Sequence, residues 1–131
     1  TPIVSIDSDD TAMRNAVAQA RERWPEFIHA FEEEQETCSS FYVKAPFDTG
    51  TDDQEFMWVK VTAIENERIF GILDNEPAGV PKLKSGDRVR IPVREVSDWM
   101  FRRGEEMNGG FTLPVLAAAA SRKKNRRPDT P

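Results

Sequence analysis

The chain has 131 residues, of which 38% are hydrophobic, with one cysteine, one histidine and a formal net charge of −5 at pH 7. This length suits a single domain that buries about two-thirds of its unfolded surface around one core. One cysteine excludes an intramolecular disulfide, and Cys38 with His29 does not supply the ligands of the usual zinc sites. We therefore expect no metal and no other cofactor.

Charge is distributed unevenly along the chain. Residues 122–131 carry five bases and one acid, a net of +4, which leaves −9 on residues 1–121 out of the total of −5. An acidic body is not the electrostatic footprint of a nucleic-acid-binding domain. We expect residues 122–131 to be a basic, disordered tail. The tail alone has the charge to contact phosphates or a membrane surface.

No apolar run approaches the roughly 20 residues of a membrane span, and the pattern of a signal peptide is absent. The sequence thus predicts a soluble, cytoplasmic protein, monomeric or weakly dimeric. Because the chain begins at Thr1 rather than Met, the possibility of a removed leader stays open.

The N-terminal part predicts a helix after a lead-in over residues 1–8, which is either an edge strand or mobile. Ser8, Asp9 and Asp10 suit the cap and first turn of a helix. Pro25 disfavours helical backbone in the residue before it but is accepted in a first turn, so we expect a kink or restart there. A stripe at helical spacing then predicts core residues, namely Met13, Ala16, Val17, Ala20 and Trp24.

The middle of the chain predicts a strand over residues 40–47 and a central hairpin of residues 56–65 and 68–74. Asn66 and Glu67 form the expected tight turn, since Asn tolerates left-handed backbone. A two-residue loop places Met57, Val59, Val61, Ala63, Phe70 and Ile72 on one face, the predicted core face. The other face, with Trp58, Ile69, Gly71 and Leu73, is half apolar. We expect it to be packed, as in a sandwiched sheet or small barrel, and the alternative is an exposed patch that binds something.

The C-terminal part predicts a half-solvated strand over residues 88–93, a helical turn over residues 94–99 and a last strand over residues 99–102. Thr112 suits a helix cap, with Pro114 in the first turn and four alanines after Leu116. The rival interpretation is a strand over residues 111–116. The expected fold is α+β: an N-terminal helix packed on a bent antiparallel sheet of about five strands, open or barrel-like, with a C-terminal helix closing a single domain over residues 9–121.

The order of these segments resembles a known family. The segments that carry the likeness are FYVKAP, EFMWVKVTAIENERIFGILDNEP, LKSGDRV, VSDWMF and GGFTLPVL. They are similar to the bacterial family of domain of unknown function 2314, from about the first helix to Leu116. Pro114 departs from the basic residue expected there. The resemblance implies a small α+β domain, found alone or beside other modules, and it implies no activity and no catalytic residue.

The sequence offers few groups for catalysis. His29 lies on a predicted helix as a surface histidine, Cys38 matches no nucleophile motif, and Ser97-Asp98 has no base to complete a triad. We therefore assign no catalytic residue and rank an enzyme of unknown type third among the possible functions.

A non-catalytic module that binds a small ligand or a protein is the leading hypothesis. Trp58 and Asn75 meet at the open end of the hairpin, and two tryptophans with a few polar anchors suit a mostly apolar cleft. The alternative for the tryptophans is core filling. The alternative function is an acidic immunity or regulatory protein that neutralises a basic protein partner. The candidate ligand-binding residues are Trp58, Asn75, Asp98, Trp99, Gly109, Gly110 and Thr112.

Overall fold

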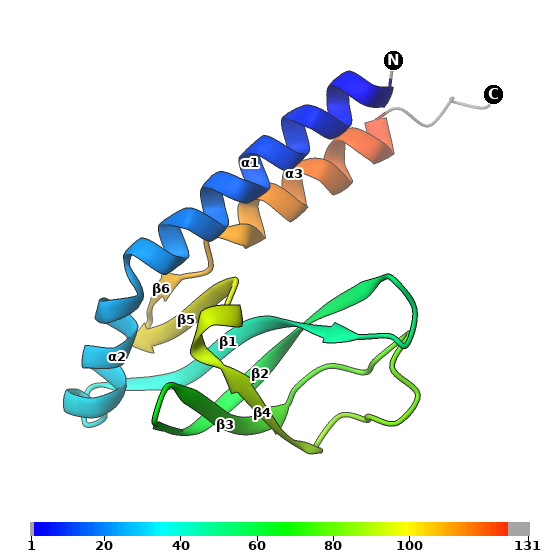
Figure 1. The fold of residues 1–131 in the computed structure, drawn as a ribbon. Coiled ribbons are helices and arrows are strands. Elements are labelled where there is room, and N and C mark those ends of the chain that lie inside the picture. Colours follow the sequence, from blue (N-terminus) through cyan, green and yellow to red (C-terminus); the bar gives the residue numbers. More distant parts are fainter. Residues whose placement is uncertain (1, 126–131) are drawn as a thin grey trace.

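The computed structural model describes residues 2–125 and confirms the α+β fold. Within those residues, three helices pack against one antiparallel sheet of six strands in the order β4-β3-β2-β1-β5-β6 (Figure 1). The helices are α1 (Pro2–Glu22), α2 (Trp24–Glu33) and α3 (Thr112–Asn125), and a 3-10 turn spans Val93–Glu95. The strands are β1 (Cys38–Asp48), β2 (Gln54–Glu65), β3 (Arg68–Leu73), β4 (Arg88–Pro92), β5 (Asp98–Arg103) and β6 (Glu106–Gly109).

The sheet has six strands where about five were predicted, and it is open rather than barrel-like. Its edges are β4 and β6, which do not pair with each other, so it is not a barrel. Strand β6 was missed because Glu106, Met107, Asn108 and Gly109 have little intrinsic preference for a strand. They pair because the turn at Gly104, with φ of 65°, folds them back along β5.

The helices begin and end partly where expected. Helix α1 ends at Glu22 and α2 restarts with Pro25 in its first turn, as predicted. Helix α1, however, begins at Pro2, so the predicted start near Asp9 is wrong; proline is favoured at a first helical position, and Ser and Asp cost little inside a helix. Helix α3 begins at Thr112, as predicted, and continues to Asn125, into the segment expected to be disordered. Residues 126–131 of that segment lie outside the described residues.

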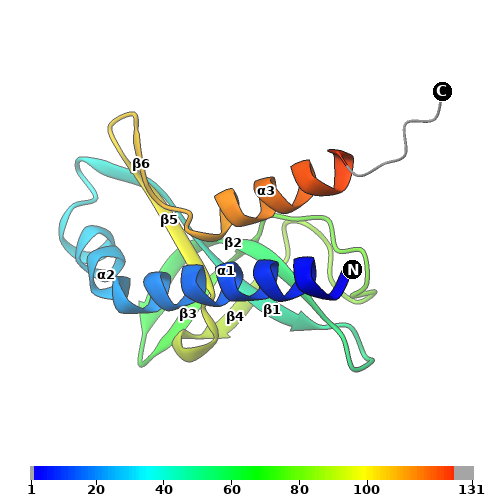
Figure 2. The same cartoon turned by 90° about the horizontal axis from the view of Figure 1, so that it is seen from above.

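The hydrophobic core lies between one face of the sheet and helices α1 and α2. In Figures 1 and 2 both helices lie over the same side of the sheet, and α3 lies alongside α1, with which it is in contact. Phe27 of α2 packs against Trp99, Phe41 and Phe101, with ring centroids 5.6 to 6.2 Å apart. Phe41, Val43 and Ala45 alternate along β1 and are buried in this core.

The central hairpin contains a bulge that changes the predicted register. Its turn is the predicted one, with Asn66 and Glu67 both at positive φ, and Glu65 pairs with Arg68. Between Val61 and Ala63 the pairing slips by one residue, so Val61 lies opposite Gly71 rather than Ile72. Because side chains alternate along a strand, the slip reverses the predicted face of β3. Ile69 and Leu73 are therefore in the core, and Phe70 and Ile72 are half-buried on the other face.

Gly71 permits this bulge, because a Cβ atom there would overlap the carbonyl oxygen of Lys60 and come within 2.6 Å of Val59 Cγ1. We expect Gly71→Ala to lower the free energy of unfolding by about 1–3 kcal/mol, the usual cost of overpacking. Urea unfolding followed by circular dichroism measures it. Gly104→Ala is the control: its Cβ would meet nothing within 4 Å, so its cost is the backbone strain alone, about 1 kcal/mol. Equal losses in the two variants would contradict the contact explanation.

Candidate functional site

A pocket of about 360 Å³ lies between α1, α3 and side chains of strands β1 and β2 that point away from the core. Its walls are mostly apolar and include the exposed side chains of Phe56 and Leu116. This size and lining are typical of small-molecule sites. The lining residues are Met13, Val17, Lys44, Phe56, Trp58, Asn75, Ser97, Thr112 and Leu116.

Lys44 is the one charged side chain among the described residues that line this pocket. Strand β1 places it on the face opposite Val43, and only 6% of its surface is exposed. Its ammonium donates to Thr112 Oγ1 at 2.7 Å and lies 5.7 Å from the centre of the Trp58 ring. Burial lowers the pKa of Lys44, and the nearby charge of Asp98 opposes that shift only in part. No carboxylate of the described residues pairs directly with this ammonium.

Asp98 lies behind the pocket, fully buried, and anchors the start of α3. Its Oδ1 accepts from the backbone N–H groups of Trp99 and Phe111, at 2.8 and 3.0 Å. Its Oδ2 accepts from the backbone N–H of Thr112 at 2.9 Å and from the Thr112 hydroxyl. The helix N-terminus and these donors stabilise the carboxylate charge. The Thr112 hydroxyl thus links the ammonium of Lys44 to the carboxylate of Asp98.

Trp58 and Asn75 form another side of the pocket. The backbone N–H of Trp58 donates to Asn75 Oδ1 at 2.6 Å, and the N–H of Asp74 donates to the Trp58 carbonyl at 2.9 Å. These two bonds fix the backbone of Trp58 at the end of the hairpin and thereby position its side chain in the pocket lining. The convergence of Trp58, Asn75 and Thr112 on one pocket brings together three of the residues selected from the sequence.

The other selected residues lie elsewhere. Trp99 is fully buried and donates its indole N–H to the carbonyl of Ala20 at 2.8 Å, so it fills the core. Gly109 is needed for close packing, since a Cβ there would overlap the carbonyl oxygen of Trp99 and come within 2.6 Å of its ring. Gly110 donates its N–H to that carbonyl at 2.7 Å. The two glycines fit the chain against Trp99 and do not line the pocket of Lys44.

Lys44 itself was missed by sequence reasoning. The alternation of Phe41, Val43 and Ala45 placed it on the outward face of the strand, where a lysine is normally solvated. The residues next to Lys44 in the sequence give no sign of its burial, because Thr112, which covers it, is distant in the chain.

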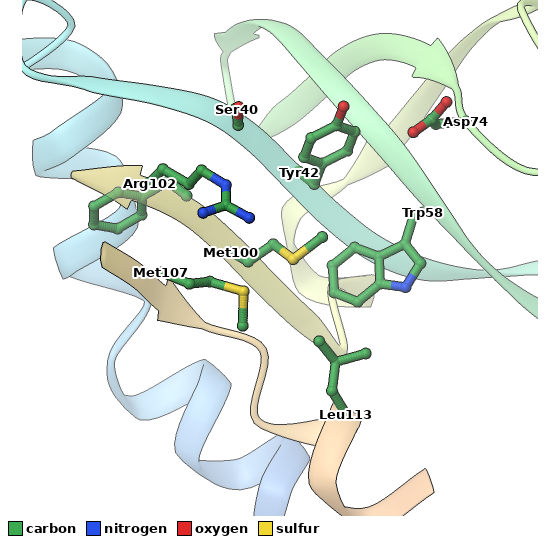
Figure 3. Close-up of a pocket in the computed structure, with 9 residues that line it drawn as sticks. Ser40, Tyr42, Trp58, Asp74, Met100, Arg102, Met107 and Leu113 are labelled. Atoms are coloured by element: carbon green, nitrogen blue, oxygen red, sulfur yellow. The ribbon is translucent and has the colours of Figure 1, made fainter. Parts of the chain in front are cut away.

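A second pocket, of about 470 Å³, also has Trp58 in its lining (Figure 3). In Figure 3, Met100 and Met107 lie to the left of Trp58 and Leu113 lies below it, with Tyr42 and Asp74 above. The face of the hairpin that carries Trp58 was expected to be packed beneath another layer, and the structure leaves it partly open. The pocket is lined by Ser40, Tyr42, Trp58, Asp74, Met100, Phe101, Arg102, Met107 and Leu113.

Other groups with chemical potential do not gather into a site. His29 is largely exposed and lies 3.9 Å from Glu34 at the end of α2. Within the described residues, no three His, Cys, Asp or Glu side chains are placed to hold a metal ion. None of the helices described here is long and apolar enough to cross a membrane.

Comparison with known proteins assigns the chain to a family. Residues 10–130 match the family described as "Uncharacterized protein conserved in bacteria (DUF2314)". The chain belongs to this family. The resemblance drawn from the segment order is therefore confirmed, and its segments contribute Trp58, Asn75, Asp98 and Thr112 to the pocket and the wall behind it.

Two relatives are similar over most of this chain. The DUF2314 domain is 31% identical over 114 residues to the "Uncharacterized protein YegJ" of Escherichia coli, covering 87% of this chain and 72% of that one. It is 28% identical to a "Putative ankyrin repeat protein" of Neisseria meningitidis serogroup B, over 97% of this chain. The chain spans 53%, about half, of that relative. No solved structure matches.

Proposed function

We propose that this DUF2314 domain is a non-catalytic binding module whose pocket takes a small molecule with an apolar body and a carboxylate head. The observation that carries the proposal is the Lys44 ammonium, buried in a mostly apolar pocket with one hydrogen bond and no direct counterion among the described residues. An ammonium has three donors, and a buried charge is stabilised by a paired opposite charge. A ligand carboxylate would supply that charge.

Asp98 does not take this place. Its two oxygens already accept four hydrogen bonds, three of them from backbone N–H groups, and Thr112 stands between it and Lys44. The apolar walls, which include Met13, Val17 and Phe56, would bury the body of the ligand. Burial of such a body supplies affinity, and the Lys44 ammonium supplies orientation and selectivity.

The test compares sodium octanoate with octanol, which have equal apolar bodies, by isothermal titration calorimetry. We expect octanoate to bind about 10- to 100-fold more tightly, because a hydrogen bond to a charged group contributes about 1.5–3 kcal/mol. In Lys44→Met this preference should vanish while the domain stays folded, since a side chain of similar shape fills the position and Asp98 keeps its own four hydrogen bonds. Equal binding of octanoate and octanol to the native protein would overturn the proposal.

The preference should also depend on pH with a definite sign. Because burial lowers the pKa of Lys44, its ammonium is lost at a lower pH than an ordinary lysine, whose pKa is about 10.4. Octanoate affinity should therefore be retained below the lowered pKa and fall as pH rises through it, while octanol affinity stays level.

The salt dependence of binding distinguishes this site from the alternative, a basic protein partner. Attraction of such a partner to the acidic body weakens steeply as ionic strength rises, whereas a buried ion pair between Lys44 and a ligand weakens little.

A further inference from the structure

Lys44 is the one buried lysine among those whose exposure the structure describes. Its side chain is 6% exposed, whereas Lys60, Lys82 and Lys84 lie on the exposed surface. Burial lowers the pKa of Lys44, because the charged form is poorly solvated in a mostly apolar pocket. At a given pH, a larger share of this side chain is therefore neutral amine than in an ordinary lysine, and the neutral amine is the nucleophilic form.

The hydrogen bonds around Lys44 leave the lone pair of this amine free. A hydroxyl has one proton, and the proton of Thr112 Oγ1 is donated to Asp98 Oδ2. Thr112 Oγ1 can therefore only accept from Lys44, which it does at 2.7 Å. No side-chain or backbone donor among the described residues is hydrogen-bonded to the Lys44 nitrogen. The neutral amine thus has a lone pair available to an electrophile in the pocket.

The surroundings of this nitrogen suit a carbonyl compound with an apolar body. The walls of Met13, Val17 and Phe56 can bury a hydrocarbon chain, as they would for a carboxylate. The Trp58 ring centre lies 5.7 Å from the nitrogen, and a protonated imine would hold the same single positive charge there as the ammonium does. Desolvated lysines in apolar pockets are the ones that form Schiff bases with carbonyl compounds.

From this geometry we propose that Lys44 captures aliphatic aldehydes covalently, as an imine, inside the pocket. The amine nitrogen attacks the carbonyl carbon, the π electron pair of the carbonyl moves to its oxygen, and a proton passes from nitrogen to that oxygen to give a carbinolamine. The nitrogen lone pair then forms the C=N bond as hydroxide leaves, and hydroxide takes the remaining proton of the nitrogen to become water.

This capture goes beyond the proposed function while using the same pocket for the apolar body. The carboxylate head pairs with the ammonium of Lys44, whereas the aldehyde head bonds to the amine. Nothing is oxidised or reduced, and the capture is stoichiometric and is reversed by water, so the domain remains a binding module.

The experiment treats the native protein with a straight-chain aldehyde and sodium cyanoborohydride, which reduces an imine to a stable secondary amine. Peptide mass spectrometry then gives the initial rates of labelling at Lys44 and at the exposed Lys60, the internal control. We expect Lys44 to be labelled faster than Lys60. At subsaturating aldehyde, the ratio of the two rates should rise at least about tenfold from propanal to octanal, since each buried methylene contributes about a fourfold gain in affinity.

Two matched variants assign the label to its site. Lys44→Met should lose the label that depends on chain length and keep the label at Lys60, and Lys60→Met should do the reverse. Labelling of Lys44 no faster than that of Lys60 overturns the inference, as does a ratio of rates that is the same for propanal and octanal.

Sodium octanoate distinguishes failure of this inference from failure of the proposed function. If both hold, octanoate slows labelling at Lys44 and leaves labelling at Lys60 unchanged, because the two head groups use the same nitrogen. Octanoate binding in calorimetry without preferential labelling of Lys44 overturns the inference and leaves the proposed function standing. Preferential labelling of Lys44 without octanoate binding supports the inference and overturns the proposed function.

Discussion

Trp99→Ala should lower the free energy of unfolding by about 3–5 kcal/mol, the range for removing a large aromatic side chain from a core. Trp99 has 0% of its surface exposed and contacts the rings of Phe27, Phe101 and Phe111, with centroids 5.3 to 5.8 Å away. Its indole N–H is bonded to the carbonyl of Ala20 in α1. The substitution therefore leaves a cavity and removes the hydrogen bond that joins α1 to strand β5.

Urea unfolding followed by far-ultraviolet circular dichroism measures this loss. Domains of this size have a total stability of about 5–15 kcal/mol, so Trp99→Ala removes a large share of it, and Trp99→Phe serves as the milder variant. Trp58→Phe is the matched control, because Trp58 is half-buried and its indole N–H makes no hydrogen bond among those described. Equal losses of unfolding free energy in Trp99→Phe and Trp58→Phe would contradict this expectation.

Asp98→Ala should cost about 3–5 kcal/mol, as expected when one partner of a buried charge network is removed. Three backbone N–H groups and the Thr112 hydroxyl lose their acceptor, and the ammonium of Lys44 loses the nearest compensating charge. The start of α3 is the part of the fold most affected, since two of those N–H groups belong to Phe111 and Thr112.

Hydrogen exchange and a double-mutant cycle test this expectation. Asp98→Ala should expose the amides of Phe111 and Thr112 to exchange, while amides at the Asn66–Glu67 end of the hairpin keep their protection. Adding Lys44→Met to Asp98→Ala should recover part of the loss, with a coupling of about 0.5–3 kcal/mol, because it removes the uncompensated ammonium. Strict additivity of the two substitutions would show that Lys44 and Asp98 are not energetically linked.

The Lys44–Thr112–Asp98 connection joins the pocket to the anchoring of α3. A ligand carboxylate that pairs with Lys44 contacts the same group that compensates Asp98, so ligand binding should raise the stability of the α3 start as well as that of the whole domain. The pocket and the fold of the C-terminal helix thus depend on the same three side chains.

Local chemistry in the sequence determined much of the fold. The break before Pro25, the turn at Asn66 and Glu67 and the helix start at Thr112 are all present in the structure. Each depends on a residue's own backbone preference or on neighbours within a few positions, which is why the chain alone predicts them. The inward alternation of Phe41, Val43 and Ala45 was predictable for the same reason.

Tertiary structure alone decided the bulge opposite Gly71, the pairing of β6 and the burial of Lys44. Each involves contacts between segments far apart in the chain: the slip in β2 brings Ile69 of β3 into the core, and Lys44 is buried because Thr112 and the walls of α1 and α3 close over it. The alternation of apolar and polar residues along a strand shows neither a one-residue slip in pairing nor a remote segment that covers one face. The sequence thus pointed to Trp58, Asn75 and Thr112, and the packing of remote segments added the charge that gives their pocket its chemistry.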